Sequence, residues 1–317
     1  MKSKDNMVFL FSGQGSQYGG MGEKLFKKNA IFRNSLEQSE VIVQKQLSRS
    51  LIEELYYMDE YPFDDLLITH PAIVAVEIAM YRVLQEKGIT PDYVAGSSLG
   101  EFAAGVASGV WAAESAIEAA IEQAKSIVSN DVSGGMLAVI HENKYLEPLY
   151  LKHQLYLAAD NFEGHFTLAG LAQHLDAFQA ELNKLDIQFL RLPVNYPFHS
   201  PQIEYGRHSF MYNTGSASSL AAPNAGFISG VYSKELSLLP DDYFWKAISC
   251  YMNFPATVAY LENRGACCYI DVGPSGTGAT FVKYNLNHSS TSHTFQIMTP
   301  YKRELEQLER LQGNLRL

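Results

Sequence analysis

The sequence predicts an α/β fold in which a large domain with a parallel sheet carries a small inserted domain. Strand-like and helix-like segments alternate along most of the 317 residues, which is typical of parallel strands joined by crossover helices. From about residue 134 the order becomes strand, helix, strand, strand, helix, strand, which is the ferredoxin-like βαββαβ unit. We therefore assign residues 1–133 and 195–317 to the large domain and residues 134–194 to the small domain.

The large domain is expected to begin with a strand over the apolar residues 8–11. Residues 72–87 repeat apolar side chains at helical spacing, with Pro71 before them and Gly88 after them, so they predict an amphipathic helix. A short buried strand over residues 92–95 follows directly.

The remaining elements follow from the same patterns. In the small domain we expect strands at residues 136–140, 155–158, 165–169 and 187–192, and helices at residues 143–152 and 171–185. Near the C-terminus, residues 269–272 predict a strand that ends at a Gly-Pro pair. A last helix, with Leu305, Leu308 and Leu311 on one face, is expected to cover the surface.

Composition excludes several classes of function. The net charge is −10 and no stripe of Lys or Arg is visible, which argues against a nucleic acid or an anionic membrane as partner. The apolar run at residues 7–11 is too short for a signal peptide or a membrane span. The three cysteines, Cys250, Cys267 and Cys268, are odd in number and lack framework spacing, which predicts reduced thiols and a cytoplasmic protein. No residue cluster has metal-ligand spacing, so we expect neither a metal nor a cofactor.

The pentapeptide GSSLG at residues 96–100 predicts a serine nucleophile, Ser98, on a sharp turn between a strand and a helix. At the start of a helix, free backbone N–H groups and the helix dipole would stabilise a developing oxyanion. The alternative is a strand–helix junction that uses small residues only for packing.

A serine hydroxyl needs a base, and His199 is the main candidate. It lies in a proline-stiffened loop where the small domain returns to the large one, which would hold it at the cleft between the domains. It could also be a loop histidine exposed to water. His70, near the start of the predicted helix, is a second candidate, whereas His165 and His174 are expected to be structural or solvated.

The first loop, residues 11–17, contains closely spaced glycines that would let its backbone approach a ligand. In a parallel sheet this loop would open on the same edge as the Ser98 turn. The alternative is an ordinary Gly-rich turn.

Four motifs occur in a fixed order: QGSQ at 14–17, GSSLGEF at 96–102, FHS at 198–200 and VGP at 272–274. With the small domain inserted between the second and third, the chain resembles the malonyl-CoA:acyl-carrier-protein transacylases and polyketide synthase acyltransferase domains over nearly its whole length. The resemblance implies an α/β-hydrolase-like large domain with the site in the cleft beside the ferredoxin-like insert.

The same resemblance implies roles for particular residues. Ser98 would be the nucleophile, His199 the base, and the backbone N–H groups of Gln14 and Leu99 the oxyanion hole. The family orients its histidine through a main-chain carbonyl, which we place near Ala247.

Three positions depart from the family pattern. Ser97 stands where the family usually has histidine, and His70 stands where it has glutamine. Family members that use malonyl groups clamp the free carboxylate with an arginine, and that position, 25 residues after Ser98, is Gln123. Helical spacing places Gln123 on the inward face, either as a core amide or as a group lining the pocket. We expect Gln123, His70, Ser97 and Phe198 to contact the acyl group.

A glutamine amide cannot neutralise a carboxylate, and burying a malonyl group without its partner would cost about 3–5 kcal/mol. The expected substrate is therefore a short uncharged acyl group such as acetyl. The chain is similar to the free-standing acyl hydrolases of polyketide synthases that lack built-in acyltransferases, which clear stalled acyl units from carrier proteins.

We therefore expect a cytoplasmic, monomeric hydrolase of acyl carrier proteins, whose phosphopantetheine arrives with the substrate. The alternative is a transacylase that passes the acyl group to a carrier thiol. A generic lipase or esterase is disfavoured because no clear acid loop follows the serine. The intact Ser98 and His199 argue against a non-catalytic docking subunit.

Overall fold

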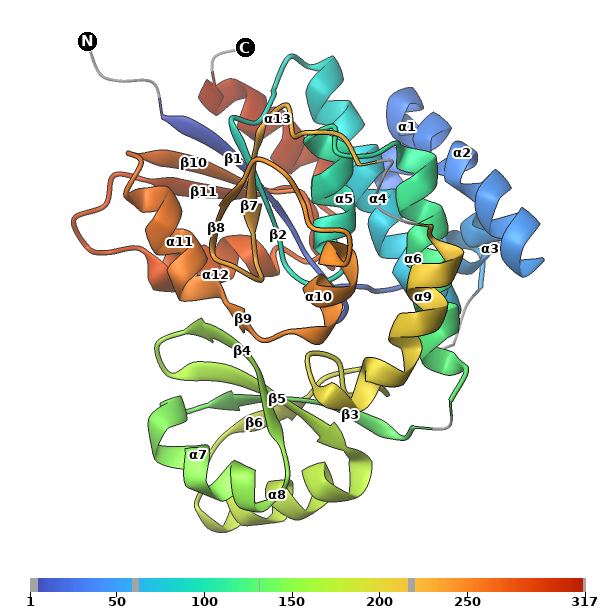
Figure 1. Ribbon diagram of the computed structural model, residues 1–317. Coiled ribbons are helices and arrows are strands. Elements are labelled where there is room, and N and C mark those ends of the chain that lie inside the picture. Colours follow the sequence, from blue (N-terminus) through green and yellow to red (C-terminus); the bar gives the residue numbers. More distant parts are fainter. Residues whose placement is uncertain (1–4, 59–62, 131, 216–219, 316–317) are drawn as a thin grey trace.

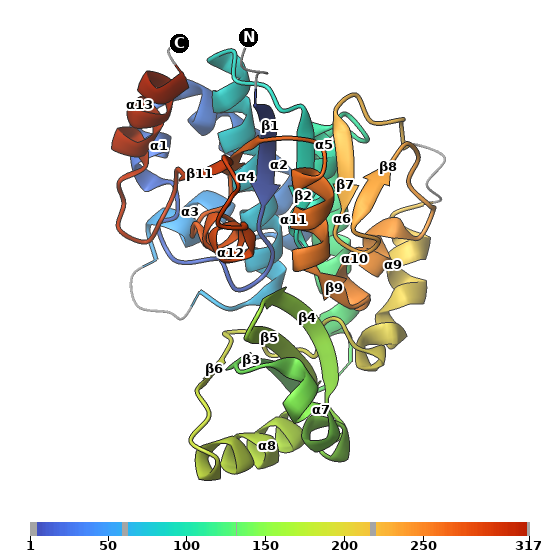
Figure 2. The same ribbon diagram turned by 90° about the vertical axis from the view of Figure 1, so that its left-hand side faces the viewer.

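The computed structural model describes residues 5–58, 63–130, 132–215 and 220–315. It contains two sheets, one in each domain, and the first and last described residues lie on the side of the large domain that is remote from the small one (Figures 1 and 2). The α/β fold with an inserted ferredoxin-like unit is confirmed.

The large sheet has six strands in the order β11-β10-β1-β2-β7-β8, all parallel except β8. Its strands are β1 (Asn6–Phe11), β2 (Tyr93–Gly96), β7 (Gly226–Ser229), β8 (Lys234–Leu236), β10 (Cys267–Asp271) and β11 (His293–Gln296). Alternate residues of β1 face opposite sides, because successive side chains of a strand point in opposite directions. Phe9 and Phe11 join the main core, whereas Val8 and Leu10 pack with the smaller core on the other face.

Helices cover both faces of this sheet (Figure 1). The larger side contains α1 (Glu23–Lys28), α2 (Ala30–Leu47), α3 (Leu51–Tyr56), α4 (Leu66–Glu86), α5 (Gly100–Ala107), α6 (Ala113–Val128), α9 (Arg207–Asn213), α10 (Tyr243–Ser249) and α13 (Glu304–Leu315). The opposite side contains α11 (Phe254–Glu262) and α12 (Thr277–Asn285). A 3₁₀ helix, η1 (Pro201–Gly206), precedes α9.

The second sheet has the order β6-β3-β5-β4-β9. It is formed by β3 (Gly134–Ile140), β4 (Tyr156–Phe162), β5 (His165–Leu171), β6 (Phe189–Arg191) and β9 (Met252–Asn253). Helices α7 (Asn143–Lys152) and α8 (Ala172–Lys184) cover its outer face, and the other face is turned toward the large domain (Figure 2). Strand β9, which comes from the last third of the chain, pairs with β4 and so links the large domain to the sheet of the small domain.

Helix α4 differs from the sequence prediction. It begins at Leu66, with the Asp65 side chain accepting a hydrogen bond from the Leu67 amide at 3.1 Å, so Pro71 lies inside the helix. It is buried on nearly all sides rather than on one face. By length and composition it is the one described helix that could cross a bilayer, but 83% of its apolar window is buried, as in the core helix of a globular protein.

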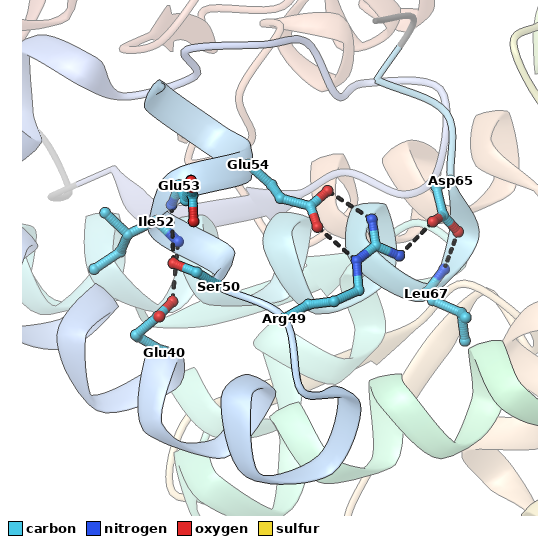
Figure 3. Close-up of polar contacts among 8 residues, drawn as sticks. All are labelled: Glu40, Arg49, Ser50, Ile52, Glu53, Glu54, Asp65 and Leu67. Carbon is cyan, nitrogen blue, oxygen red and sulfur yellow. Dashed lines mark hydrogen bonds and ion pairs between the residues drawn. The ribbon is translucent and has the colours of Figure 1, made fainter. Parts of the chain in front are cut away.

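The start of α4 is fixed to the preceding helices by one arginine (Figure 3). Arg49 forms a bidentate ion pair with Glu54, at 2.5 and 2.6 Å, and a second pair with Asp65. Bidentate pairs of this kind are geometrically specific. The helix that carries His70 therefore has a defined starting point.

Candidate active site

Ser98 lies on a strained turn between β2 and α5. Its φ angle is +56°, in the left-handed region that residues with a side chain rarely adopt. The flanking glycines are required because backbone atoms lie too close for a side chain. A Cβ on Gly96 would lie 2.4 Å from the Glu101 amide nitrogen, and a Cβ on Gly100 would lie 2.3 Å from the Phe11 carbonyl oxygen. The turn therefore raises Ser98 at the carboxyl edge of the sheet.

His199 meets Ser98 across the cleft. Its Nε2 lies 2.8 Å from Ser98 Oγ, and its Nδ1 lies 2.7 Å from the carbonyl oxygen of Cys250. Because a carbonyl oxygen can only accept a hydrogen bond, Nδ1 carries the proton and donates a hydrogen bond to the Cys250 carbonyl. Nε2 is then unprotonated and accepts a hydrogen bond from the serine hydroxyl. This is the arrangement of an activated nucleophile and its base.

The placement of the orienting carbonyl near Ala247 was wrong. Ala247 lies inside α10, where backbone carbonyls serve the helix. Cys250 follows the end of α10, and its amide makes the last helical bond, to the Lys246 carbonyl at 2.9 Å. Its own carbonyl is therefore available for His199.

Burial in the cleft keeps His199 neutral. Desolvation lowers its pKa to about 4, and the hydrogen bond to the Cys250 carbonyl works in the opposite direction. At neutral pH the imidazole is thus in the form that accepts a proton.

The Gly-rich loop after β1 lies directly against the Ser98 turn. A Cβ on Gly13 would lie 2.6 Å from the Ser97 carbonyl oxygen and 2.9 Å from Ser98 Cβ, so only glycine allows this approach. Among the described residues, neither the Gln14 nor the Leu99 backbone N–H has a hydrogen-bond partner. Two free amides beside a nucleophile are the donors that an oxyanion hole needs.

A cavity of about 340 Å³ extends from these groups between the two sheets. The large domain contributes Ser98, His199 and the Ser12–Ser16 loop, and the small domain contributes Met136, Ala138, Ala159, Asn161, His165, Thr167, Leu190 and Leu192. None of the described residues that line it is Lys, Arg, Asp or Glu. Its three histidines are His70, His165 and His199, and burial lowers the pKa of each, that of His70 to about 3. The cavity is therefore without charge at neutral pH.

The structure brings together most of the residues expected to contact the acyl group. Ser97, Phe198 and His70 line the cavity, and the His70 and Phe198 rings are 5.6 Å apart. Gln123 faces inward from α6 as expected and is fully buried, but it lies behind His70. Its Oε1 bonds to His70 Nδ1, and it is absent from the cavity wall. Its influence on the acyl group therefore passes through His70.

Sequence reasoning missed the polar wall contributed by the small domain. Asn161 Nδ2 donates to His165 Nδ1 at 2.9 Å and to Thr167 Oγ1 at 3.0 Å. His165, expected to be structural or solvated, lines the cavity. The alternation along β5 is the signal that could have found this wall, since Thr167 lies on the face opposite Phe166 and Leu168.

Comparisons with known proteins identify the family of the chain. The acyl transferase domain family matches residues 8–315. The chain belongs to this family. One relative is the polyketide biosynthesis acyltransferase homolog PksD of Bacillus subtilis (strain 168), 37% identical over 95% of this chain and 94% of the relative. Another is the homolog BaeD of Bacillus velezensis, 34% identical over 98% of this chain and 96% of the relative.

Solved structures of acyltransferases share the fold. The loading acyltransferase of the avermectin polyketide synthase aligns with a TM-score of 0.90 over 98% of this chain and 100% of that chain, at 21% identity. A malonyl CoA-acyl carrier protein transacylase from Clostridium perfringens aligns with a TM-score of 0.83 over 98% of this chain and 97% of that chain, also at 21% identity. At this identity the likeness shows the fold alone.

Proposed function

We propose that this acyltransferase-family enzyme removes short uncharged acyl groups, such as acetyl, from acyl carrier proteins in polyketide biosynthesis. The observation that carries the proposal is the cavity beside Ser98, whose described lining residues carry no charge. Gln123, at the position where the resemblance implies an arginine in members that use malonyl groups, lies behind His70 and is hydrogen-bonded to it. Relatives named for polyketide biosynthesis support the setting.

The geometry supports an acyl-enzyme mechanism. His199 Nε2 takes the Ser98 proton as Oγ attacks the thioester carbonyl carbon, and the carbonyl oxygen becomes an oxyanion held by the Gln14 and Leu99 amides. The Cys250 carbonyl stabilises the imidazolium through Nδ1–H. Collapse of the intermediate breaks the C–S bond, and the leaving phosphopantetheine thiolate takes the proton from His199.

Water completes the cycle. His199 removes a proton from a water molecule as its oxygen attacks the ester carbonyl of the acyl-enzyme. The second tetrahedral intermediate expels Ser98 Oγ, which recovers its proton from His199, and the carboxylic acid leaves. The carrier protein brings phosphopantetheine with it, so the chain needs no cofactor of its own. We include a monomeric state and a cytoplasmic location in the proposal.

The chemistry of chain extension favours hydrolysis as the fate of an acetyl group. An acetyl unit on an extension carrier has no second carboxyl to lose, so it blocks the carrier and its removal restores the synthase. Membership of an acyltransferase family favours the second candidate, in which a carrier thiol replaces water as the acceptor. The two functions share every step up to the acyl-enzyme.

The test is mass spectrometry of acetyl- and malonyl-carrier protein incubated with the enzyme, with and without an unacylated acceptor carrier. We expect acetyl-carrier protein to be converted to free carrier and acetate in either case, and malonyl-carrier protein to react about a hundredfold more slowly. Efficient malonyl transfer to the acceptor would instead assign the enzyme as a transacylase of charged acyl groups.

Restoring the family's pair of residues should reverse this preference. The double variant His70→Gln, Gln123→Arg removes the hydrogen-bonded His70–Gln123 pair beside the cavity. Its new guanidinium group can form an ion pair with a malonyl carboxylate. We expect the ratio of malonyl to acetyl kcat/KM to rise by about a hundredfold, with acetyl turnover reduced because an unpaired cation then adjoins the cavity. Gln123→Glu is the matched control and should not increase malonyl turnover. An unchanged ratio in the double variant would show that this pair does not determine the choice of acyl group.

A further inference from the structure

We propose that Glu77 is a positioning residue that holds the Gln14 amide in place for the oxyanion. The inference rests on the proposed acyl-enzyme chemistry. Glu77 lies within the core helix α4, outside the cavity, and its side chain is fully buried. It does not touch the reacting atoms and acts through the loop that carries the amide.

The contacts of Glu77 lead to the start of the oxyanion loop. Its Oε1 accepts two hydrogen bonds from Ser12, one from the backbone N–H at 2.6 Å and one from Oγ at 3.1 Å. Ser12 follows the last residue of β1, lines the cavity and precedes Gln14 by two residues. Hydrogen bonds are electrostatically stronger in a buried site of low dielectric, where no water competes for the acceptor.

The other bonds of the loop are mostly internal. The Gly13 carbonyl accepts from the Ser16 amide at 3.3 Å and from Ser16 Oγ at 2.7 Å, and the Gly15 amide donates to Gln17 Oε1 at 2.7 Å. These bonds define the shape of the loop. Its start is joined to the Ser98 turn by the Ser97 amide, which donates to the Phe11 carbonyl at 2.8 Å. Beyond Phe11, α4 holds the loop through Glu77 and through Thr69, whose Oγ1 accepts from Gln14 Nε2 at 3.2 Å.

Little room remains for Ser12 to move. A Cβ on Gly273 would lie 2.0 Å from Ser12 Oγ, so the VGP segment closes the side away from α4. The Asp271 carboxylate, at the end of β10, accepts hydrogen bonds from the Gly273 amide at 2.9 Å and from the Ala279 amide at 2.8 Å. The Val272 amide donates to the Leu10 carbonyl at 2.9 Å, so these three amides have acceptors of their own. Among the described residues, Glu77 is the acceptor for the Ser12 N–H and Oγ.

Glu77 acts as a hydrogen-bond acceptor and does not need a negative charge. Burial and the nearby Asp271 carboxylate raise its pKa, which favours the protonated form. Its Oε2 has no hydrogen-bond partner among the described residues. A neutral glutamine, which presents the same acceptor oxygen to Ser12, should therefore replace it, whereas methionine has similar length and offers only a weakly accepting sulfur.

The experiment compares Glu77→Met, Glu77→Gln and, as a matched core control on the same helix, Val83→Ala, which is buried away from the cavity. Steady-state kinetics on acetyl-carrier protein are measured with the melting temperature of each variant. We expect Glu77→Met to lower kcat by about 30- to 100-fold with KM within threefold of wild type, because removal of an oxyanion donor affects the transition state. Glu77→Gln should stay within threefold in both constants, and Val83→Ala should lose stability without loss of kcat.

The outcomes separate the positioning role from a structural one. Three outcomes would each overturn the proposal. In the first, the kcat of Glu77→Met is within threefold of that of Val83→Ala. In the second, Glu77→Met changes only KM, and in the third, Glu77→Gln is as slow as Glu77→Met. Should Glu77→Met fail to fold, Ser12→Ala removes one of the two bonds alone and should lower kcat by about 3- to 10-fold; no change there also counts against it. Wild-type enzyme that forms no acyl-enzyme would overturn the proposed function as well, whereas active wild type with unaffected variants rejects only the role of Glu77.

Discussion

Ser98→Ala should abolish turnover of acetyl-carrier protein, with a loss of at least about 10⁴-fold in kcat. The variant removes the oxygen that lies 2.8 Å from His199 Nε2, and no other hydroxyl contacts this imidazole among the described residues. Alanine carries the same Cβ as serine, so the strain of the turn at φ +56° is unchanged and the fold should be kept. The measurement is steady-state hydrolysis, together with labelling by a serine-directed fluorophosphonate, which should modify Ser98 alone in the wild type.

Ser97 provides a matched control for this experiment. It is the adjacent serine and also lines the cavity, but its Oγ lies 4.0 Å from the Met252 sulfur rather than beside the imidazole. Ser97→Ala should therefore keep fluorophosphonate labelling at Ser98. Activity of Ser98→Ala within tenfold of wild type would place the nucleophile elsewhere.

The parts of the site that sequence reasoning located are those encoded by short-range constraints. The Gly96–Gly100 turn needs glycine at two positions where a Cβ would meet backbone, and such needs are visible as a local pattern. The same holds for the Gly13 loop, which lies against that turn. The alternation of strands and helices likewise predicted the parallel sheet, because each strand needs a crossover.

The parts that were missed depend on contacts between segments far apart in the chain. The Cys250 carbonyl faces His199 only because α10 ends one residue earlier, a boundary that propensity does not define. Gln123 lies behind His70 because α4 passes between α6 and the cavity, which helical periodicity alone cannot show. Strand β9 has only two residues, and its pairing with β4 is a tertiary event.

His199→Ala should lower kcat/KM for acetyl-carrier protein by about 10³-fold or more, since proton transfer and imidazolium stabilisation are lost together. The pH dependence offers an independent check. Because burial lowers the pKa of His199 to about 4, wild-type kcat/KM should fall as the pH decreases through about 4, and not near 6.5, where an exposed histidine titrates. The residual activity of His199→Ala should lack this step.

Comparison of His70→Ala with His199→Ala tests which of the two histidines is the base. The two histidines share the cavity and both are neutral, but His70 Nδ1 bonds to the Gln123 amide whereas His199 Nε2 bonds to Ser98 Oγ. A base must reach the proton that it removes, so geometry assigns this role to His199. We expect His70→Ala to alter the choice of acyl group more than the rate of fluorophosphonate labelling, and His199→Ala to slow that labelling by about 10³-fold. If His70→Ala proves the more damaging change for labelling, the base is His70, and Ser98 must rotate away from the hydrogen bond it makes in this structure.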